Sequence, residues 1–409
     1  MNPRMTPSTT LVDQLGEHAA RQPGQTALEC LRDDTSAPGT LTFAQLEVRA
    51  REIAAALQHT VAPGSRALLL FHRGDDYAVA FLGCLYAGVI AVPAYPPEST
   101  RAQHLERLRS ITRDARPALV LTERALQAGI APLRDVLPAA EAPRVVALED
   151  LQDSASGMAG SWRRPDLRAD SIAFLQYTSG STGSPKGVQV SHGNLMANER
   201  VIGDAFGMRP GDKVISWLPL YHDMGLIGGL LQPVFNGLSV VLMSPRHFLE
   251  RPVRWLDAIA RHGGTVSGGP DFAYRLCLER VTDEQAAALD LRSWRVAFCG
   301  SEAVRFDTLK AFSDRFAPAG FDARALYPCY GLAEATLFAT GGSRGAGMSA
   351  RAFDAQALSA RHTAEPRPDG VMLVGSGHVQ AAHEVRIATA DGAGTAPDGT
   401  VGEVWVNGP

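Results

Sequence analysis

Tyr-Thr-Ser-Gly-Ser-Thr-Gly-Ser-Pro-Lys-Gly occupies residues 177–187, between two apolar runs at residues 171–176 and 188–190 that predict short strands. Glycines let the backbone approach an anion and aim successive N–H groups at it, while the hydroxyls and the lysine add donors and positive charge. The spacing is not that of a Walker A loop. On composition alone a flexible surface turn is the better interpretation, and only the full string favours a phosphate-binding loop.

Short apolar runs alternate with amphipathic segments on both sides of this loop. Further strands are predicted at residues 67–71, 89–92, 119–121, 214–217, 238–243, 265–267, 295–299 and 325–326. Helices are predicted at residues 41–58, 76–87, 101–115, 194–206, 226–236, 252–262, 272–281 and 306–316. Thr42 is the expected cap of the first helix, and Ser191 or Asn194 that of the helix after the loop. The alternation predicts an α/β fold with two wound, mostly parallel sheets flanked by helices.

The pattern changes from about residue 343. Residues 343–370 are small and polar without strand spacing, and short strands are then predicted at residues 371–374, 383–387 and 401–406. We therefore expect two wound subdomains over residues 1–342, followed by an insertion segment and a small β subdomain over residues 343–409. Residues 131–160, rich in Ala, Pro and Gly, are predicted to loop over the surface.

Composition narrows the class of protein. The chain has 409 residues, 45% of them hydrophobic, and a net charge of −4, which gives no sign of nucleic-acid binding. Its five cysteines are spread without a Cys-x-x-Cys pair, which favours reduced thiols over a disulfide framework or zinc site. No signal peptide and no run near about 18 apolar residues is present, so we expect a cytoplasmic protein without a membrane span.

Residues 177–187 closely resemble the nucleotide loop of the adenylate-forming enzymes, which include acyl-CoA synthetases, nonribosomal peptide adenylation domains and luciferases. Four more blocks match in order, at residues 217–229 (WLPLYHDMGLIGG), 267–274 (SGGPDFAY), 298–302 (FCGSE) and 327–336 (YPCYGLAEAT). Together they resemble the fatty acyl-AMP ligase branch over nearly the whole chain. The blocks also begin at or near predicted strand ends, where open α/β sheets bind ligands.

The resemblance implies a site for ATP and Mg²⁺. Lys186 is expected to hold the β- and γ-phosphates, Tyr330 to stack on adenine, and Glu334 to hold Mg²⁺, a cation that prefers oxygen ligands. Without the motifs, a solvated glutamate and a core tyrosine are the ordinary alternatives. The implied nucleotide-binding residues are Thr178, Ser179, Gly180, Ser181, Thr182, Gly183, Lys186, Gly300, Ser301, Glu302, Tyr330, Gly331, Leu332 and Ala333. Many relatives place threonine where Ala333 stands, so one hydroxyl contact to phosphate is missing.

His222 lies in a Tyr-His-Asp triplet just after a predicted strand. In isolation the favoured interpretation is a structural histidine bonded to Asp223. The resemblance implies instead that His222 lies beside the bound carboxylate and donates a hydrogen bond to it. His222 and Lys186 are therefore the two residues in this chain expected to act in catalysis. The implied acyl-binding residues are Met224, Gly269, Phe272 and Tyr274, although such apolar residues are more often ordinary core.

The implied reaction is ATP-dependent activation of a fatty acid to acyl-adenylate with release of pyrophosphate, then transfer to the phosphopantetheine thiol of an acyl carrier protein. A fatty acyl-CoA ligase is the alternative, and a non-catalytic nucleotide- or acyl-adenylate-binding or carrier-docking domain is the alternative from another class. In the resembling enzymes a catalytic lysine lies in a C-terminal lid domain, after a ribose-binding aspartate. Both are expected beyond Pro409.

Overall fold

The computed structural model describes residues 10–33, 36–97, 102–178, 185–380, 383–389, 392 and 394–409, which form two compact units. The first unit is Met1–Met196 with Trp217–Pro245, and the second is Ala197–Ser216 with Arg246–Pro409. Residues 217–245 belong to the first unit, where strand β10 (Ser239–Leu242) pairs in parallel with β1 (Thr26–Cys30). The expected boundary at residue 342 stays a prediction.

The main sheet of the first unit has six strands in the order β6-β5-β3-β4-β7-β8. All are parallel except β8, which runs antiparallel to β7. A smaller group has the order β10-β1-β2. The remaining strands are β2 (Gly39–Thr42), β3 (Arg66–Leu70), β4 (Ile90–Pro93), β5 (Leu119–Thr122), β6 (Arg144–Ala147), β7 (Ile172–Thr178) and β8 (Lys186–Ser191). The predicted parallel wound sheet is thus confirmed, with its core around Leu68, Leu70, Val92 and Val120.

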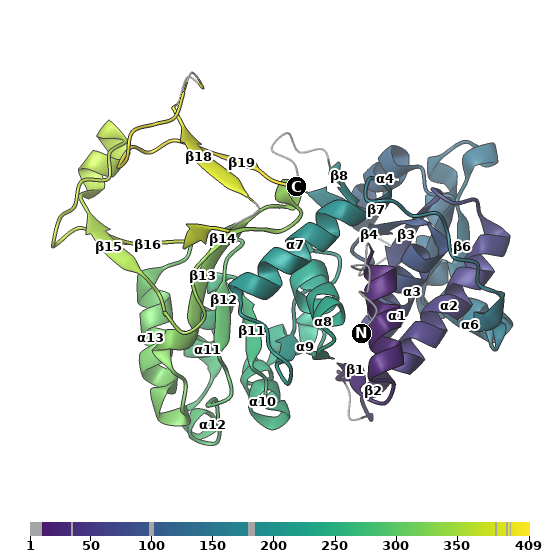
Figure 1. Ribbon diagram of the computed structural model, residues 1–409, viewed down its shortest axis with the longest axis horizontal. Helices are drawn as coiled ribbons and strands as arrows, with labels where there is room; N and C mark the ends of the chain where they lie inside the picture. Colours follow the sequence, from purple (N-terminus) through teal and green to yellow (C-terminus); the bar gives the residue numbers. More distant parts are fainter. Residues whose placement is uncertain are drawn as a thin grey trace, which may run out of the picture. The chain divides into compact units, whose positions relative to one another are not determined.

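Helices flank this sheet, and α1–α3 appear in purple to blue in Figure 1. They are α1 (Leu11–Arg21), α2 (Phe43–Thr60), α3 (Gly74–Ala87), α4 (Ala102–Ala115), α5 (Gln127–Ile130), α6 (Leu148–Ala155), α7 (His192–Ala205), which continues into the second unit, and α8 (Gln232–Asn236). Thr42 caps α2 with a capping box, as predicted. Ser191 Oγ accepts from Asn194 N at 3.0 Å and Asn194 Oδ1 accepts from Ser191 N at 3.0 Å, so both predicted residues cap α7.

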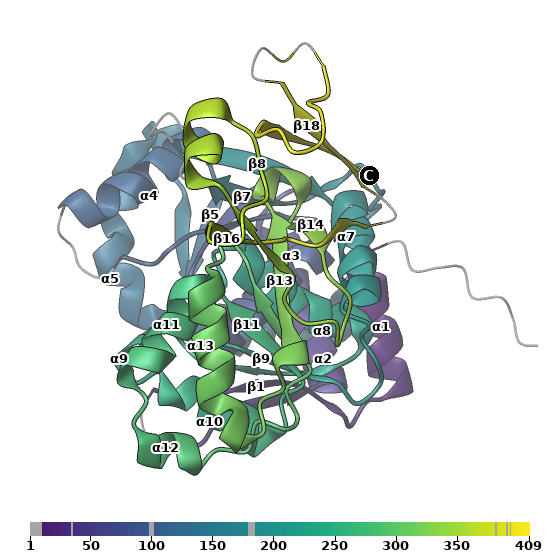
Figure 2. The ribbon, with the colours of Figure 1, turned by 90° about the vertical axis from the view of Figure 1, so that its left-hand side faces the viewer.

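The second unit carries strands in the order β17-β14-β13-β12-β11-β9. The four strands β9 (Lys213–Ser216), β11 (Val266–Gly269), β12 (Val296–Cys299) and β13 (Leu326–Gly331) are parallel, whereas β14 (Phe338–Gly341) and β17 (His378–Val379) are antiparallel. Its helices are α9 (Pro245–Glu250), α10 (Val253–His262), α11 (Asp271–Arg280), α12 (Asp283–Ala287) and α13 (Phe306–Phe316). Figure 2 shows α13 beside β13.

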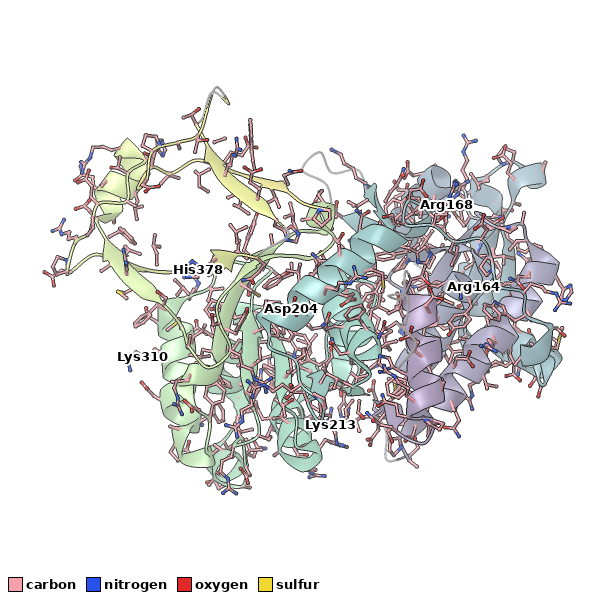
Figure 3. The ribbon with its side chains drawn as sticks, viewed as in Figure 1. Arg164, Arg168, Asp204, Lys213, Lys310 and His378 are labelled. Carbon is pink, nitrogen blue, oxygen red and sulfur yellow. The ribbon has the colours of Figure 1, made fainter. Side chains whose placement is uncertain are left out.

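An aromatic core joins these helices to the strands. Tyr274 of α11 is stacked on Trp294 and meets Trp255 and Phe312 edge to face. On the outer side of α13, Lys310 points away from the strands (Figure 3), where its ammonium pairs with Asp314 at 2.6 Å. The second predicted wound sheet is therefore confirmed, and α13 lies where the sequence predicted a helix.

The C-terminal segment forms two separate hairpins in yellow-green and yellow (Figure 1): β15 (Ala350–Phe353) with β16 (Val371–Val374), and β18 (Glu384–Ala388) with β19 (Glu403–Asn407). β15 lies within residues 343–370, where no strand was predicted, because pairing with β16 rather than its own pattern makes it a strand. The predicted surface loop at residues 131–160 was wrong in part, since it contains β6 and α6. Among the described residues, no helix has both the length and the apolar character to cross a bilayer.

Candidate functional site

The predicted residues divide between the two units. In the first, Thr178 ends β7 and Lys186 begins β8, and the two are cross-strand partners at the base of the predicted phosphate loop. Ser179, Gly180, Ser181, Thr182 and Gly183 lie outside the described residues. Thr178 is half-buried and Lys186 is exposed, so a ligand bound by this loop could contact both side chains.

Tyr177 shapes the base of the same loop. A Cβ at Gly187 would lie 2.9 Å from the Tyr177 ring, so a larger residue here would force the ring to shift. The Tyr177 hydroxyl donates to Asp114 Oδ2 of α4 at 2.5 Å. Burial, followed by this hydrogen bond, raises the pKa of Tyr177, so the phenol remains a neutral donor. The loop therefore begins from a strand that is tied to the helix beside it.

The backbone around His222 is held from both sides. His222 N donates to Pro219 O at 3.1 Å, and Leu226 N donates to His222 O at 2.8 Å. Gln176 Nε2, on the strand that leads into the phosphate loop, donates to Tyr221 O at 3.0 Å. The carboxyl end of β7 and the histidine triplet are thus neighbours in the first unit.

The His222 side chain is half exposed and its Nδ1 lies 2.6 Å from Asp223 Oδ1. The hydrogen bond to Asp223 raises the pKa of His222, with burial and Arg107 acting in the opposite direction. The two predicted roles of His222 are therefore compatible: Nδ1 is bonded to Asp223, and the rest of the ring is exposed to a ligand. The expected contact with a carboxylate stays a prediction.

The helix after His222 differs from the predicted α-helix at residues 226–236. A π-helix, η5 (Met224–Leu231), comes first and is followed by the short α8. Asp223 Oδ1 accepts from Met224 N at 2.7 Å at its start. A Cβ at Gly225 would overlap the carbonyl oxygen of Pro219, so glycine allows the tight entry. Because π-helices are rare and frequent at functional sites, this wider turn marks the segment that carries the predicted acyl contact Met224.

In the second unit, the turn at residues 300–302 follows β12. Ser301 adopts a left-handed backbone with φ of 71°, a conformation uncommon outside glycine. Glu302 Oε1 accepts from Phe272 N, at the start of α11, at 2.8 Å. Asp271 Oδ1 accepts in turn from Arg305 N at 2.8 Å. The predicted nucleotide turn and the helix with the predicted acyl contacts Phe272 and Tyr274 are therefore bonded to each other.

The predicted acyl contacts of this unit differ in surroundings. Phe272 is half-buried, whereas Tyr274 is fully buried and its hydroxyl donates to Phe298 O at 2.8 Å. Core packing therefore accounts for Tyr274 without a ligand. Gly269 ends β11 and pairs with Cys299 of β12. At the residue before it, Gly268, a Cβ would overlap Phe298 O. The assignment of all three to an acyl chain stays a prediction.

Glu334 is exposed in a single 3₁₀ turn, η8 (Ala333–Ala335), directly after β13 and the half-buried Tyr330. The backbone then reverses at Thr336, with φ of 68° and ψ of −63°, and Leu337 N donates to Ala335 O at 2.9 Å. This γ-turn is strained, especially for a β-branched residue. Strain of this kind persists only where the surroundings over-determine the backbone.

Asn198 of α7, a residue that no sequence motif marked, provides that constraint. Its Nδ2 donates to Phe338 O at 2.9 Å and its Oδ1 accepts from Phe338 N at 3.0 Å, with a longer contact from Nδ2 to Ala335 O. The side chain is 2% exposed. The available signal was a polar residue on the apolar stripe of a predicted helix, because a buried amide needs partners.

One exposed carboxylate fits the expected metal. Mg²⁺ is usually held by one or two carboxylates, with waters and substrate phosphates as its other ligands. Among the residues that the structure describes, no cluster of three or more His, Cys, Asp or Glu forms an all-protein cage. Glu334, exposed at a strand end next to the predicted nucleotide residues, has the chemistry that a metal shared with phosphates requires.

Comparison with known proteins defines the family. The family model described as AMP-binding enzyme matches residues 15–409. JamA of Moorena producens, a medium-chain-fatty-acid–[acyl-carrier-protein] ligase, is 40% identical over 86% of this chain and 59% of its own length. FadD25 of Mycobacterium tuberculosis, named a putative fatty-acid–CoA ligase, is 37% identical over 98% of this chain and 70% of its own. The chain belongs to the AMP-binding enzyme family.

A solved structure of a relative has the same fold as this chain. The fatty acyl-adenylate ligase of Legionella pneumophila, in complex with acyl adenylate and pyrophosphate, is 38% identical with a TM-score of 0.90. It is matched over 98% of this chain and 69% of its own length. The α/β architecture predicted from the sequence is therefore that of an adenylate-forming enzyme. This chain spans between 59% and 70% of the length of these three relatives.

Proposed function

We propose that this chain carries the binding surfaces for ATP-dependent activation of a fatty acid to acyl-adenylate, with release of pyrophosphate. The observation that carries the proposal is the placement of His222 and its neighbours. An imidazole half open to solvent follows a strand end, is oriented by Asp223, and is bonded through Tyr221 to the strand that enters the phosphate loop. The complex of the Legionella relative with acyl adenylate and pyrophosphate supports the same chemistry.

In the proposed reaction a carboxylate oxygen attacks the α-phosphorus of ATP. The new carboxyl O–P bond forms as the bond from the α-phosphorus to the bridging oxygen of pyrophosphate breaks, so pyrophosphate leaves with the electron pair. No proton has to be removed from an ionised carboxylate, so His222 orients and binds it rather than acting as a base. The chain's role is positioning and neutralisation of charge.

In the second unit, Tyr330 and the turn at residues 300–302 are proposed to contact adenine and the acyl phosphate. The metal that Glu334 is proposed to hold would neutralise phosphate charge. The turn that carries Glu334 is held from behind by Asn198. Tyr330, at the end of the adjoining strand, is half-buried. A rigid turn is suited to this task because preorganised charge needs no rearrangement during the reaction.

Lys186→Ala is expected to weaken ATP binding by roughly 1.5–3 kcal/mol, the contribution of a charge-assisted contact. The side chain is exposed at the base of the loop, so the fold should be unaffected. Calorimetric titration with a non-hydrolysable ATP analogue measures the effect. Lys213→Ala, which also begins a strand, is the matched control and should bind as the parent chain does. If Lys186→Ala binds the analogue as tightly as the parent chain does, the assignment of the phosphate loop is wrong.

The acceptor of the acyl group is proposed to be an acyl carrier protein. JamA supports this by name, whereas the name of FadD25 supports the alternative, a CoA ligase. Residues 343–370 resemble an insertion of the fatty acyl-AMP ligases, at a place where ordinary acyl-CoA synthetases are much shorter. It is not a featureless loop, since Arg344 forms a largely buried ion pair with Asp212 at 2.7 Å and β15 pairs with β16. A segment tied down in this way is expected to hinder access of coenzyme A.

The experiment supplies the full-length protein with fatty acid, ATP and Mg²⁺, and follows pyrophosphate and acyl-AMP. Coenzyme A or a phosphopantetheinylated carrier protein is then added in parallel. We expect acyl-AMP, transfer to the carrier thiol and little acyl-CoA. Efficient acyl-CoA formation would promote the CoA-ligase alternative. Absence of pyrophosphate release, together with retained nucleotide binding, would instead favour the non-catalytic binding domain.

A further inference from the structure

We propose that Asp223 is a positioning residue that keeps the His222 ring doubly protonated, so that the Nε2–H group serves as the donor to the carboxylate of the acyl substrate. The inference rests on the proposed function and extends it to Asp223, the hydrogen-bond partner of the ring. It concerns the first unit alone.

The geometry assigns the two ring nitrogens different tasks. Nδ1 is 2.6 Å from Asp223 Oδ1, so this nitrogen carries a proton and donates it to the carboxylate. No partner of Nε2 is found among the described residues, and the ring is half exposed. Nε2 is therefore the nitrogen left for a ligand.

Tautomer chemistry then decides what Nε2 can bind. A neutral imidazole whose proton is on Nδ1 has a bare lone pair on Nε2, which accepts hydrogen bonds and repels a carboxylate. Only the imidazolium has a proton on both nitrogens. With Asp223 in place, His222 can thus hold an acyl carboxylate only in its charged form.

Asp223 differs from the carboxylate of a solvated surface pair because it is buried and hydrogen-bonded to the backbone. It is 9% exposed, and its Oδ1 also accepts from Met224 N at 2.7 Å, so the side chain cannot swing away without losing a backbone bond. His222 is equally fixed, through bonds of its own backbone to Pro219 and Leu226. The pair is preset at the entry to the π-helix before any ligand arrives.

The charged groups that act on His222 among the described residues are Asp223 and Arg107 of α4. Asp223 raises the pKa of the ring, whereas burial and the positive charge of Arg107 lower it. Because the pKa is raised overall, the imidazolium is fully present below the ordinary value and is lost as pH rises through the raised value. Binding of a carboxylate should therefore weaken with rising pH.

The first experiment titrates the His222 ring by NMR in the parent protein and in Asp223→Asn, with the signal assigned from His222→Gln. Asparagine retains an oxygen for Met224 N but lacks the charge, so we expect the pKa of His222 to fall. Asp150→Asn, which removes an exposed carboxylate of α6, is the control and should leave the titration unchanged. An unchanged pKa in Asp223→Asn would overturn the inference.

The second experiment measures binding of dodecanoate and of the uncharged dodecanamide between pH 6 and pH 9. Dodecanoate affinity should fall about tenfold per pH unit above the pKa of His222, and should be roughly tenfold weaker for Asp223→Asn than for the parent at high pH. Dodecanamide binding should not change with pH. His222→Gln should bind dodecanoate with little dependence on pH.

The outcomes separate the two levels of the proposal. If dodecanoate binding is independent of pH, or keeps its pH dependence in His222→Gln, the role of Asp223 is wrong while fatty acid activation stands. If neither ligand binds and no pyrophosphate is released with any fatty acid, the proposed function fails, and the NMR titration still decides whether Asp223 holds the ring protonated.

Discussion

Glu334→Gln is expected to lower the rate of acyl-adenylate formation roughly 100-fold or more, the size of effect seen when one preorganised charge-stabilising group is removed. Glutamine has nearly the same shape as glutamate but lacks the charge that attracts a metal ion. The side chain is exposed on a turn that Asn198 holds from behind, so its replacement should not disturb the fold. The loss should therefore appear in turnover rather than in stability.

The measurement is the initial rate of pyrophosphate release as a function of Mg²⁺ concentration. Glu334→Gln should need more Mg²⁺ for half of its own maximal rate, and its melting temperature should match that of the parent. Glu384→Gln, which removes an exposed carboxylate from β18 of the same unit, is the matched control. A parent-like rate and Mg²⁺ dependence in Glu334→Gln would remove the metal assignment.

Gly331→Ala is expected to destabilise the chain by about 3 kcal/mol or more, at the upper end of the usual cost of overpacking. Gly331 lies at an irregularity in the pairing of β13 with β14: Tyr330 pairs with Thr340 and Gly331 with Phe338, so β14 has one extra residue, Ala339, at this point. A Cβ here would overlap the carbonyl oxygen of Leu337, and a backbone atom cannot move aside as the end of a flexible side chain can. The strained turn that follows Glu334 would be displaced with it.

Gly342→Ala is the control, because a Cβ at that position approaches only the Tyr327 ring, at 4.0 Å. Urea unfolding of both variants gives the comparison. Gly342→Ala should stay within about 1 kcal/mol of the parent, the scale of a glycine-to-alanine exchange without a clash. Equal stability of the two variants would show that the backbone at residue 331 adapts without cost, contrary to the close approach seen in the structure.

Much of the fold follows from local pattern. The parallel strands are continuous apolar runs, the capping boxes at Thr42 and Ser191 begin the helices that they were predicted to begin, and α13 has the predicted bounds. These features depend on neighbours in the sequence, and the alternation of short apolar runs with helical periodicity is enough to show them. The matching blocks at strand ends were visible for the same reason.

Other elements were invisible because their cause lies far along the chain. β15 is a strand through pairing with β16, and β10 belongs with β1 although about 210 residues separate them, so no local pattern predicts either. The π-helix at Met224 arises where Gly225 meets the carbonyl of Pro219, a contact that helical periodicity cannot show. Asn198 likewise has a role only through a backbone turn 140 residues away.

The sequence by itself determined the class of fold, the family motifs and the types of residue available for the chemistry: a glycine- and hydroxyl-rich loop with Lys186, an imidazole at His222 and a carboxylate at Glu334. Only the tertiary structure decided which ring nitrogen of His222 is engaged by Asp223, that Tyr274 is enclosed by an aromatic core, and that Asn198 clamps the turn behind Glu334. The physical reason is that motifs and periodicity depend on covalent spacing. Hydrogen bonds and burial instead depend on distances in space, which are set when remote segments pack together.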